Sequence, residues 1–135
     1  SSGYPMSVDL TRGKLYFNPG ETAACDLLAR RDVDAALIIA ADAASNFPRS
    51  TVEALADIPV IQIDPYENPT TLLSDVVIPC AIAGVEVEGT AYRMDGLSLR
   101  LRKLVDSCLP SDEEILMGIL GSVHRQRQMM ANQGV

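Results

Sequence analysis

The chain has 135 residues, of which 47% are hydrophobic and 21% are charged, a composition typical of one globular domain with its own core. Its formal net charge of −7 argues against a surface for nucleic acid or for an anionic membrane, because both are polyanions. Residues 35–41 form the longest apolar stretch, far short of the roughly 20 residues that cross a membrane, and the three cysteines form no C-x-x-C pair typical of structural zinc sites.

The first segments predict an irregular start followed by a helix and a strand. Residues 3–20 are rich in glycine and proline and contain one expected short strand at 14–17. Residues 21–32 place Ala24, Leu27 and Leu28 on one side of an amphipathic helix. The apolar run 33–42 then favours a strand that is covered on both faces.

The middle of the chain repeats this alternation. Residues 48–58 predict a helix with Pro48 in its first turn. Residues 59–64 predict a buried strand, 65–74 a loop with a short helix, and 75–82 a third strand. Such an alternation predicts a single α/β domain over residues 1–135, with a mostly parallel sheet, helices on its faces and a three-layer, Rossmann-like arrangement.

The last third has a different character. Residues 85–105 alternate polar and apolar side chains around Asp95-Gly96, which predicts a β-hairpin or extended arm. A final helix is expected from Ser111, which forms a capping box with Glu114. From about Arg125 the sequence is polar, and we expect the helix to fray there. The apolar stripe of this helix comprises Ile115, Leu116, Ile119, Leu120 and Val123.

Candidate binding residues follow the ends of the strands, because open parallel sheets bind ligands at the carboxyl ends of their strands. Small residues at 40–43 would let a bulky ligand approach the backbone. Asp64 can accept hydrogen bonds from a ribose or from guanine, or it can simply cap the next turn. Thr70 and Thr71 are expected to cap the short helix and to aim its N–H groups at a phosphate.

Other polar residues give weaker signals. The chain has neither G-x-G-x-x-G nor a Walker loop, and its only histidine, His124, is expected at the surface of the last helix. Glu86 and Glu88 share one face of a strand. They are expected either to take part in acid–base chemistry or to face solvent at the edge of the sheet. A basic cluster is expected to contact phosphates, an acidic partner or solvent; it comprises Arg93, Arg100, Arg102 and Lys103.

Four segments together carry a resemblance to a known family. They resemble the B subunit of formylmethanofuran dehydrogenase, which belongs to the molybdopterin oxidoreductases. The most specific segment is "VEGTAYRMDGLSLRLRK"; the others are "GYPMSVDLTRG" with "YFNPGETAACDLL", "VDAALIIAADAASNFPRSTV" and "IPVIQIDPYENPTTLLSDVVIP". The resemblance covers nearly all of residues 3–106 and implies that this chain is the C-terminal portion of a larger subunit.

The resemblance also implies a cofactor and the residues that bind it. Members of this superfamily hold tungsten or molybdenum between two molybdopterin guanine dinucleotides, and their α/β domains bind the guanosine ends. By position, Asp64 resembles the acid that reads guanine. The other implied cofactor-binding residues are Asn18 and Gly20 near the pterin, Ala40, Ala41 and Asp42 under the ribose and pyrophosphate, and Glu88, Gly89 and Thr90 in a closing arm.

The implied activity is the reversible reduction of carbon dioxide to a formyl group on methanofuran, in a cytoplasmic complex with other subunits. The metal-ligating cysteine or selenocysteine would lie upstream of Ser1, so we expect no catalytic residue, metal or cofactor in the isolated chain. Because the chain begins without methionine or a secretory signal, we expect a piece of a longer chain or a processed subunit.

Two other functions stay open at this point. The first is the homologous subunit of a formyltransferase/hydrolase complex, which would keep the fold without the redox chemistry. The second is a non-catalytic interaction module that docks onto sister subunits through the arm at 93–103 and the helix at 111–124.

Overall fold

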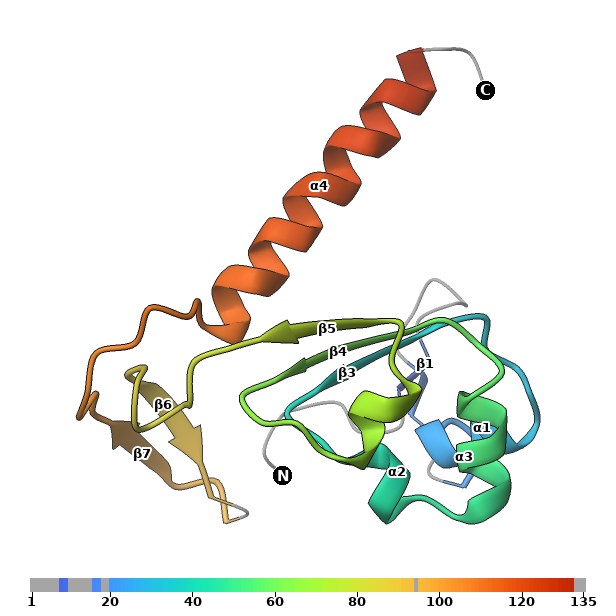
Figure 1. Cartoon of the computed structure of the whole chain (residues 1–135), viewed down its shortest axis with the longest axis horizontal. Coiled ribbons are helices and arrows are strands. Elements are labelled where there is room, and N and C mark those ends of the chain that lie inside the picture. The colour runs from blue at the N-terminus through green and yellow to red at the C-terminus, as the bar shows by residue number, and fades with distance from the viewer. Residues whose placement is uncertain (1–7, 10–15, 18–19, 94, 133–135) are drawn as a thin grey trace.

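A parallel sheet of three strands forms the centre of the molecule. The computed structural model describes residues 8–9, 16–17, 20–93 and 95–132. The sheet has the strand order β3-β4-β5. Strand β4 (Val60–Asp64) pairs in parallel with β3 (Ala36–Ile39) on one side and with β5 (Val76–Pro79) on the other (Figure 1). The predicted α/β class and parallel sheet are therefore confirmed.

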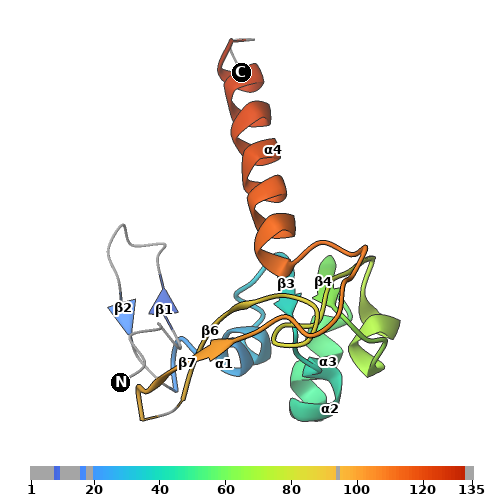
Figure 2. The same ribbon diagram turned by 90° about the vertical axis from the view of Figure 1, so that its left-hand side faces the viewer.

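Three short helices cover one face of this sheet. Helices α1 (Ala24–Ala29), α2 (Ala43–Asn46) and α3 (Arg49–Leu55) all lie on the same side of it, as both views show (Figures 1 and 2). The core lies between these helices and the sheet and comprises Leu28, Ala43, Ala54, Leu55 and Val60. Burial of these side chains provides the main stabilising free energy of this layer.

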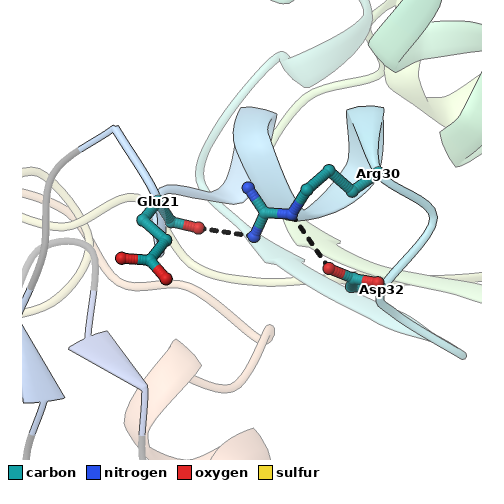
Figure 3. Close-up of polar contacts among 3 residues, drawn as sticks. All are labelled: Glu21, Arg30 and Asp32. Carbon is teal, nitrogen blue, oxygen red and sulfur yellow. Dashed lines mark hydrogen bonds and ion pairs between the residues drawn. The ribbon is translucent and has the colours of Figure 1, made fainter.

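The segment around α1 is held by one arginine. Arg30 donates from Nη2 to the backbone oxygen of Glu21 at 2.6 Å and from Nε to Asp32 Oδ2 at 2.9 Å (Figure 3). The residue after it, Arg31, has a positive φ of 58° and reverses the chain toward β3. Arg30 thus ties the segment that leads into α1 to the loop that leaves it.

The remaining strands form two antiparallel pairs. Strand β1 (Val8–Asp9) pairs with β2 (Tyr16–Phe17), within the segment where only one strand was expected. Strand β6 (Gly89–Tyr92) pairs with β7 (Ser98–Leu101), which confirms the predicted hairpin. Gly96 lies in its turn with a φ of 83°, a conformation that glycine adopts readily.

The last helix, α4 (Asp112–Asn132), has the start that the sequence predicts. Ser111 Oγ accepts from the Glu114 N–H at 3.2 Å, and Glu114 Oε2 accepts from the Ser111 N–H at 2.8 Å. The expectation that the helix frays from Arg125 is wrong, since it continues to Asn132. None of the described helices is long and apolar enough to span a membrane.

Two further predictions differ from the structure. Residues 43–46 form α2, which was not predicted, because four residues are too short to show helical periodicity. The strand at 33–42 was expected to be covered on both faces, but Leu37 is 47% exposed. Within the described residues, helices α1, α2 and α3 cover only the other face. The apolar run of this strand therefore includes side chains on the second face of the sheet, which these helices do not bury.

Candidate functional site

Two acidic side chains leave neighbouring strands at the same edge of the sheet. Asp42 follows β3, and Asp64 is the last residue of β4. The 3₁₀-helix η1 (Pro69–Leu73) lies between them and packs against α2. Thr70, on η1, donates its hydroxyl hydrogen to Asp42 Oδ1 at 2.8 Å and accepts from the Ala44 N–H at 3.0 Å. Thr70 thus joins η1 to the end of β3.

Asn68 makes the corresponding link to β4. Its Nδ2 donates to Asp64 Oδ2 at 3.2 Å. Its Oδ1 accepts from the Thr70 N–H at 3.0 Å and from Gln62 Nε2 at 3.0 Å. Asp42, Thr70, Asn68, Asp64 and Gln62 therefore form one hydrogen-bonded group, which we call the strand-end network.

The sequence did not reveal Asn68 and Gln62, although it contains a signal for each. Asn68 precedes a proline and two threonines, a pattern typical of a helix N-cap with proline at the first position. Gln62 is a polar residue within the apolar run of β4, and it is fully buried. A buried amide needs hydrogen-bond partners, so its presence predicts a polar group beside the sheet.

The expected capping role of Thr70 is wrong. Asn68 is the N-cap of η1, and Thr71 completes a capping box by accepting the Asn68 N–H at 3.0 Å. The side chain of Thr70 is fully buried, and its hydroxyl and N–H are both used within the strand-end network. Thr70 therefore holds Asp42 in position and has no surface for a ligand to contact.

Asp64 lies at the boundary between core and surface. It is 8% exposed, and its Oδ1 accepts from the Tyr66 N–H at 3.0 Å. Asp64 therefore does cap the following turn, as the alternative interpretation had it. A carboxylate offers about four acceptor positions, so the two hydrogen bonds made within the chain leave it able to accept others.

The backbone at the end of β3 is strained. Ala40 has a φ of 47°, which places its Cβ close to the following carbonyl in the left-handed region. Ala40 and Ala41 are both exposed. Residues kept in this region occur preferentially at binding sites, where the surrounding structure compensates for their cost of about 1–3 kcal/mol.

The candidate residues line separate cavities. One cavity, of about 670 Å³, is lined by Glu86, Glu88 and Lys103 and by residues at the start of α4. Two further cavities are lined by other candidates. One, of about 440 Å³, borders β3, α1 and α2 and includes Ala41 and Asp42 beside mostly apolar side chains. The other, of about 410 Å³, lies on the β6–β7 hairpin and is lined by Glu88, Gly89, Thr90, Ser98, Arg100 and Leu101. Asp64 and Thr70 line neither of these two cavities.

The hairpin nevertheless lies at the same end of the molecule as the strand-end network. Figure 1 shows the arrowheads of β3, β4 and β5 pointing toward the side that β6 and β7 occupy. Cys80 lies on the connection between β5 and the hairpin and is 3% exposed. Burial raises the pKa of the Cys80 thiol, and the carboxylates of Asp112, Asp64 and Glu86 raise it further.

Several of the other polar candidates have local partners. Glu86 accepts from the Ile82 N–H at 2.8 Å and so caps a turn next to the hairpin. Arg93 pairs with Asp95 at 2.8 Å, and Lys103 pairs with Asp106 at 2.7 Å. Of the basic cluster, Arg100 is the member that lines the hairpin cavity.

His124 is exposed on α4, as predicted. Gly20 is exposed and has a φ of 88°, whereas Asn18 lies outside the described residues. Within the part of the chain that the structure describes, no group of three or more histidine, cysteine, aspartate or glutamate residues is arranged to hold a metal ion.

Comparison with known proteins identifies the relatives of this chain. No protein-family model matches it. Over 90% of its length, it is 52% identical to the B subunit of the tungsten-containing formylmethanofuran dehydrogenase 2 of Methanocaldococcus jannaschii. Over 93% of its length, it is 44% identical to the protein of the same name from Methanococcus maripaludis. The resemblance to the B subunit of formylmethanofuran dehydrogenase is confirmed.

The chain spans less than a third of these relatives, covering 28% of the M. jannaschii protein and 30% of the M. maripaludis protein. A solved structure shares the fold. It is the formyltransferase/hydrolase complex from Methylorubrum extorquens in complex with methylofuran, with a TM-score of 0.58 and 19% identity. The similarity covers 83% of this chain and 33% of that one. The strand-end network thus lies in a stretch shared with the formylmethanofuran dehydrogenase B subunits.

Replacing Thr70 with valine tests the strand-end network. Thr70→Val keeps the shape but removes the hydroxyl, which leaves the part-buried Ala44 N–H without its acceptor and Asp42 without its donor. We expect the free energy of unfolding to fall by about 1–3 kcal/mol, measured by urea denaturation. Thr90→Val, at an exposed strand position, is the control and should change the free energy of unfolding by less than about 0.5 kcal/mol. Equal effects of the two substitutions would contradict the role given to Thr70.

Acid titration tests the environment of Asp42. Hydrogen bonding by Ser45 holds the pKa of Asp42 below its ordinary value of 3.8; burial opposes this shift, and the Thr70 hydroxyl adds to it. Because the folded-state pKa is the lower one, this stabilisation is present above pH 3.8 and is lost as the pH falls through the folded-state pKa.

We therefore expect Asp42→Asn to lose less stability than the parent chain between about pH 4 and about pH 2. The melting temperature at each pH is the measurement. Asp34→Asn, at an exposed loop position before β3, is the matched control and should follow the parent curve. Parallel curves for Asp42→Asn and the parent would show that Asp42 does not contribute to acid unfolding.

Proposed function

We propose that this chain is the part of a formylmethanofuran dehydrogenase B subunit that holds the guanosine end of a molybdopterin guanine dinucleotide. One observation carries the proposal. Asp42 and Asp64 are brought into a single hydrogen-bonded network at the carboxyl ends of parallel strands, the position where open α/β sheets bind nucleotides. The identity of 44–52% to curated B subunits supports it.

The residues present fit the nucleotide portion of such a cofactor. Asp64 keeps acceptor capacity for the N1–H and amino group of guanine. Ala40 and Ala41 are exposed, and their small side chains leave the backbone open to a ribose or a pyrophosphate. Arg100 lines the hairpin cavity and supplies positive charge in an otherwise acidic chain.

We assign each of these residues a role in cofactor binding. Asp64 reads the guanine base, and Asp42 lies with Ala40 and Ala41 beneath the ribose and pyrophosphate. Thr70 positions Asp42 from within the core. The hairpin residues Glu88, Gly89 and Thr90 close over the cofactor, and the segment with Asn18 and Gly20 runs near the pterin.

The whole enzyme would interconvert carbon dioxide and a formyl group on methanofuran in the cytoplasm, together with other subunits of the complex. When bound, the tungsten or molybdenum centre supplies the electron transfer, and its ligand would lie in a part of the enzyme that this chain does not contain. Within this chain, the proposed work of the residues is to bind and orient the nucleotide end.

The homologous subunit of a formyltransferase/hydrolase complex is the second candidate. A solved structure of such a complex shares the fold, but at 19% identity it supports the fold alone. The curated dehydrogenase subunits are 44–52% identical, and this higher identity favours the redox enzyme. Tungsten and molybdenum analysis of a full-length protein that carries this sequence separates the two, since only the dehydrogenase requires the metal.

Asp64→Asn is the direct test of the binding role. In a full-length B subunit that carries this sequence, we expect affinity for the guanine dinucleotide cofactor to fall by about 1–3 kcal/mol, because a charged hydrogen bond is lost. This corresponds to roughly 5- to 150-fold in the dissociation constant. The readout is guanosine monophosphate released by hydrolysis, per mole of protein, after equilibration with the cofactor.

Two controls separate recognition from folding. Glu67→Gln removes an exposed acid three residues away and should leave the affinity unchanged. Urea denaturation of the full-length Asp64→Asn protein reports whether loss of the Tyr66 contact has destabilised the fold. Unchanged cofactor content in a folded Asp64→Asn protein would remove Asp64 from the site.

A further inference from the structure

The face of the sheet opposite α1, α2 and α3 is apolar throughout. Side chains alternate between the two faces of a strand, so every second residue of β3, β4 and β5 points to this face. The pairing register places them in two rows across the sheet. The rows are Leu37, Ile61 and Val76, and Ile39, Ile63 and Ile78.

Much of this face is open to solvent. Leu37 is 47% exposed, Ile61 37% and Val76 47%, and the register places these three directly side by side. In the second row, Ile39 is 36% exposed, whereas Ile63 at its centre is fully buried. Parallel sheets in soluble proteins are covered on both faces, and contiguous exposed apolar surface marks an interface. We call these four residues the open sheet face.

Helix α4 rises on the same side of the sheet and, within the described part of the chain, projects away from the other helices and strands (Figures 1 and 2). Both views show it leaving the sheet on the side away from α1, α2 and α3 (Figures 1 and 2). None of its side chains is buried, and Met117, Leu120 and Val123 are 63%, 47% and 43% exposed. Because most helical stability in proteins comes from packing of an apolar side, α4 is expected to have a partner too.

The length of the relatives indicates what covers these surfaces. More than two thirds of each curated B subunit lies outside the stretch that this chain matches. We propose that an apolar helical segment from that remaining part of the protein packs on the open sheet face and against α4. A helix is the expected cover, because helices are what cover the faces of parallel sheets.

A second copy of the chain fits less well. Each copy carries a net charge of −7, so two copies would repel each other, whereas the open sheet face itself contains no charged side chain to offset this repulsion. The proposal does not depend on cofactor binding, since the strand-end network lies at the carboxyl ends of the strands and shares no residue with the open sheet face.

Cysteine labelling tests the proposal. Leu37→Cys is prepared in the 135-residue chain and in a full-length protein in which this sequence replaces the matched stretch of the M. jannaschii relative. Alkylation by N-ethylmaleimide is followed at that peptide by mass spectrometry. We expect Cys at this position to react at least about tenfold more slowly in the full-length protein, because access limits thiol reactivity.

Leu72→Cys is the matched control. Leu72 lies on η1 and is 88% exposed, so its labelling rate should agree within about twofold between the two proteins. Ile61→Cys is a second probe of the open sheet face if Leu37→Cys does not fold.

Three results would overturn the proposal. Equal labelling of the probe in both proteins would leave the sheet face open in the full-length protein. Slow labelling in the isolated monomer would mean that the chain's own residues cover the face. Protection from labelling that increases with protein concentration, together with a dimer in sedimentation, would show that a second copy of the chain covers the face.

Discussion

The candidate site depends on the hydrogen bonds that Thr70 and Asn68 make between the ends of two parallel strands. The backbone joins the ends of β3 and β4 as far as Ala40, whose N–H donates to the Ile63 oxygen at 2.9 Å. Beyond that point, Thr70 links η1 to Asp42, and Asn68 links η1 to Asp64. A buried polar network is stabilising only when its members are satisfied, and no buried side-chain nitrogen or oxygen of the described residues lacks a partner.

The buried and the exposed side chains of the strand-end network have different roles. Thr70 and Gln62 are fully buried and can act only by fixing their neighbours, whereas Asp64 retains a small exposed area and spare acceptor positions. The strained backbone at Ala40 lies next to Asp42, at the end of the same strand. Because β5 leads directly through Cys80 into the connection to the hairpin, the sheet also sets where Glu88, Gly89 and Thr90 lie.

Much of the fold was predictable because its signals are local. Apolar runs marked β3, β4 and β5, the Asp95-Gly96 turn marked the hairpin, and Ser111 with Glu114 marked the start of α4. The end of α4 was predicted too early, because the polar sequence from Arg125 suggested fraying although no proline or glycine interrupts residues 125–132. For the site, Asp64 and Asp42 were predicted from their places after strands, but the pairing of Asp42 with Thr70 spans 28 residues of sequence. Spacing alone does not reveal such a contact, nor that one sheet face stays open.

Amide hydrogen exchange at Ala44 and Thr70 measures the central contact most directly. Both N–H groups donate to side-chain oxygens of the network, Ala44 to Thr70 Oγ1 and Thr70 to Asn68 Oδ1. If the network joins the strand ends in solution, both amides should exchange at least about 100-fold more slowly than in an unstructured peptide. Exchange of both amides at the peptide rate, in a chain whose β4 amides remain protected, would show that the strand ends are not held together.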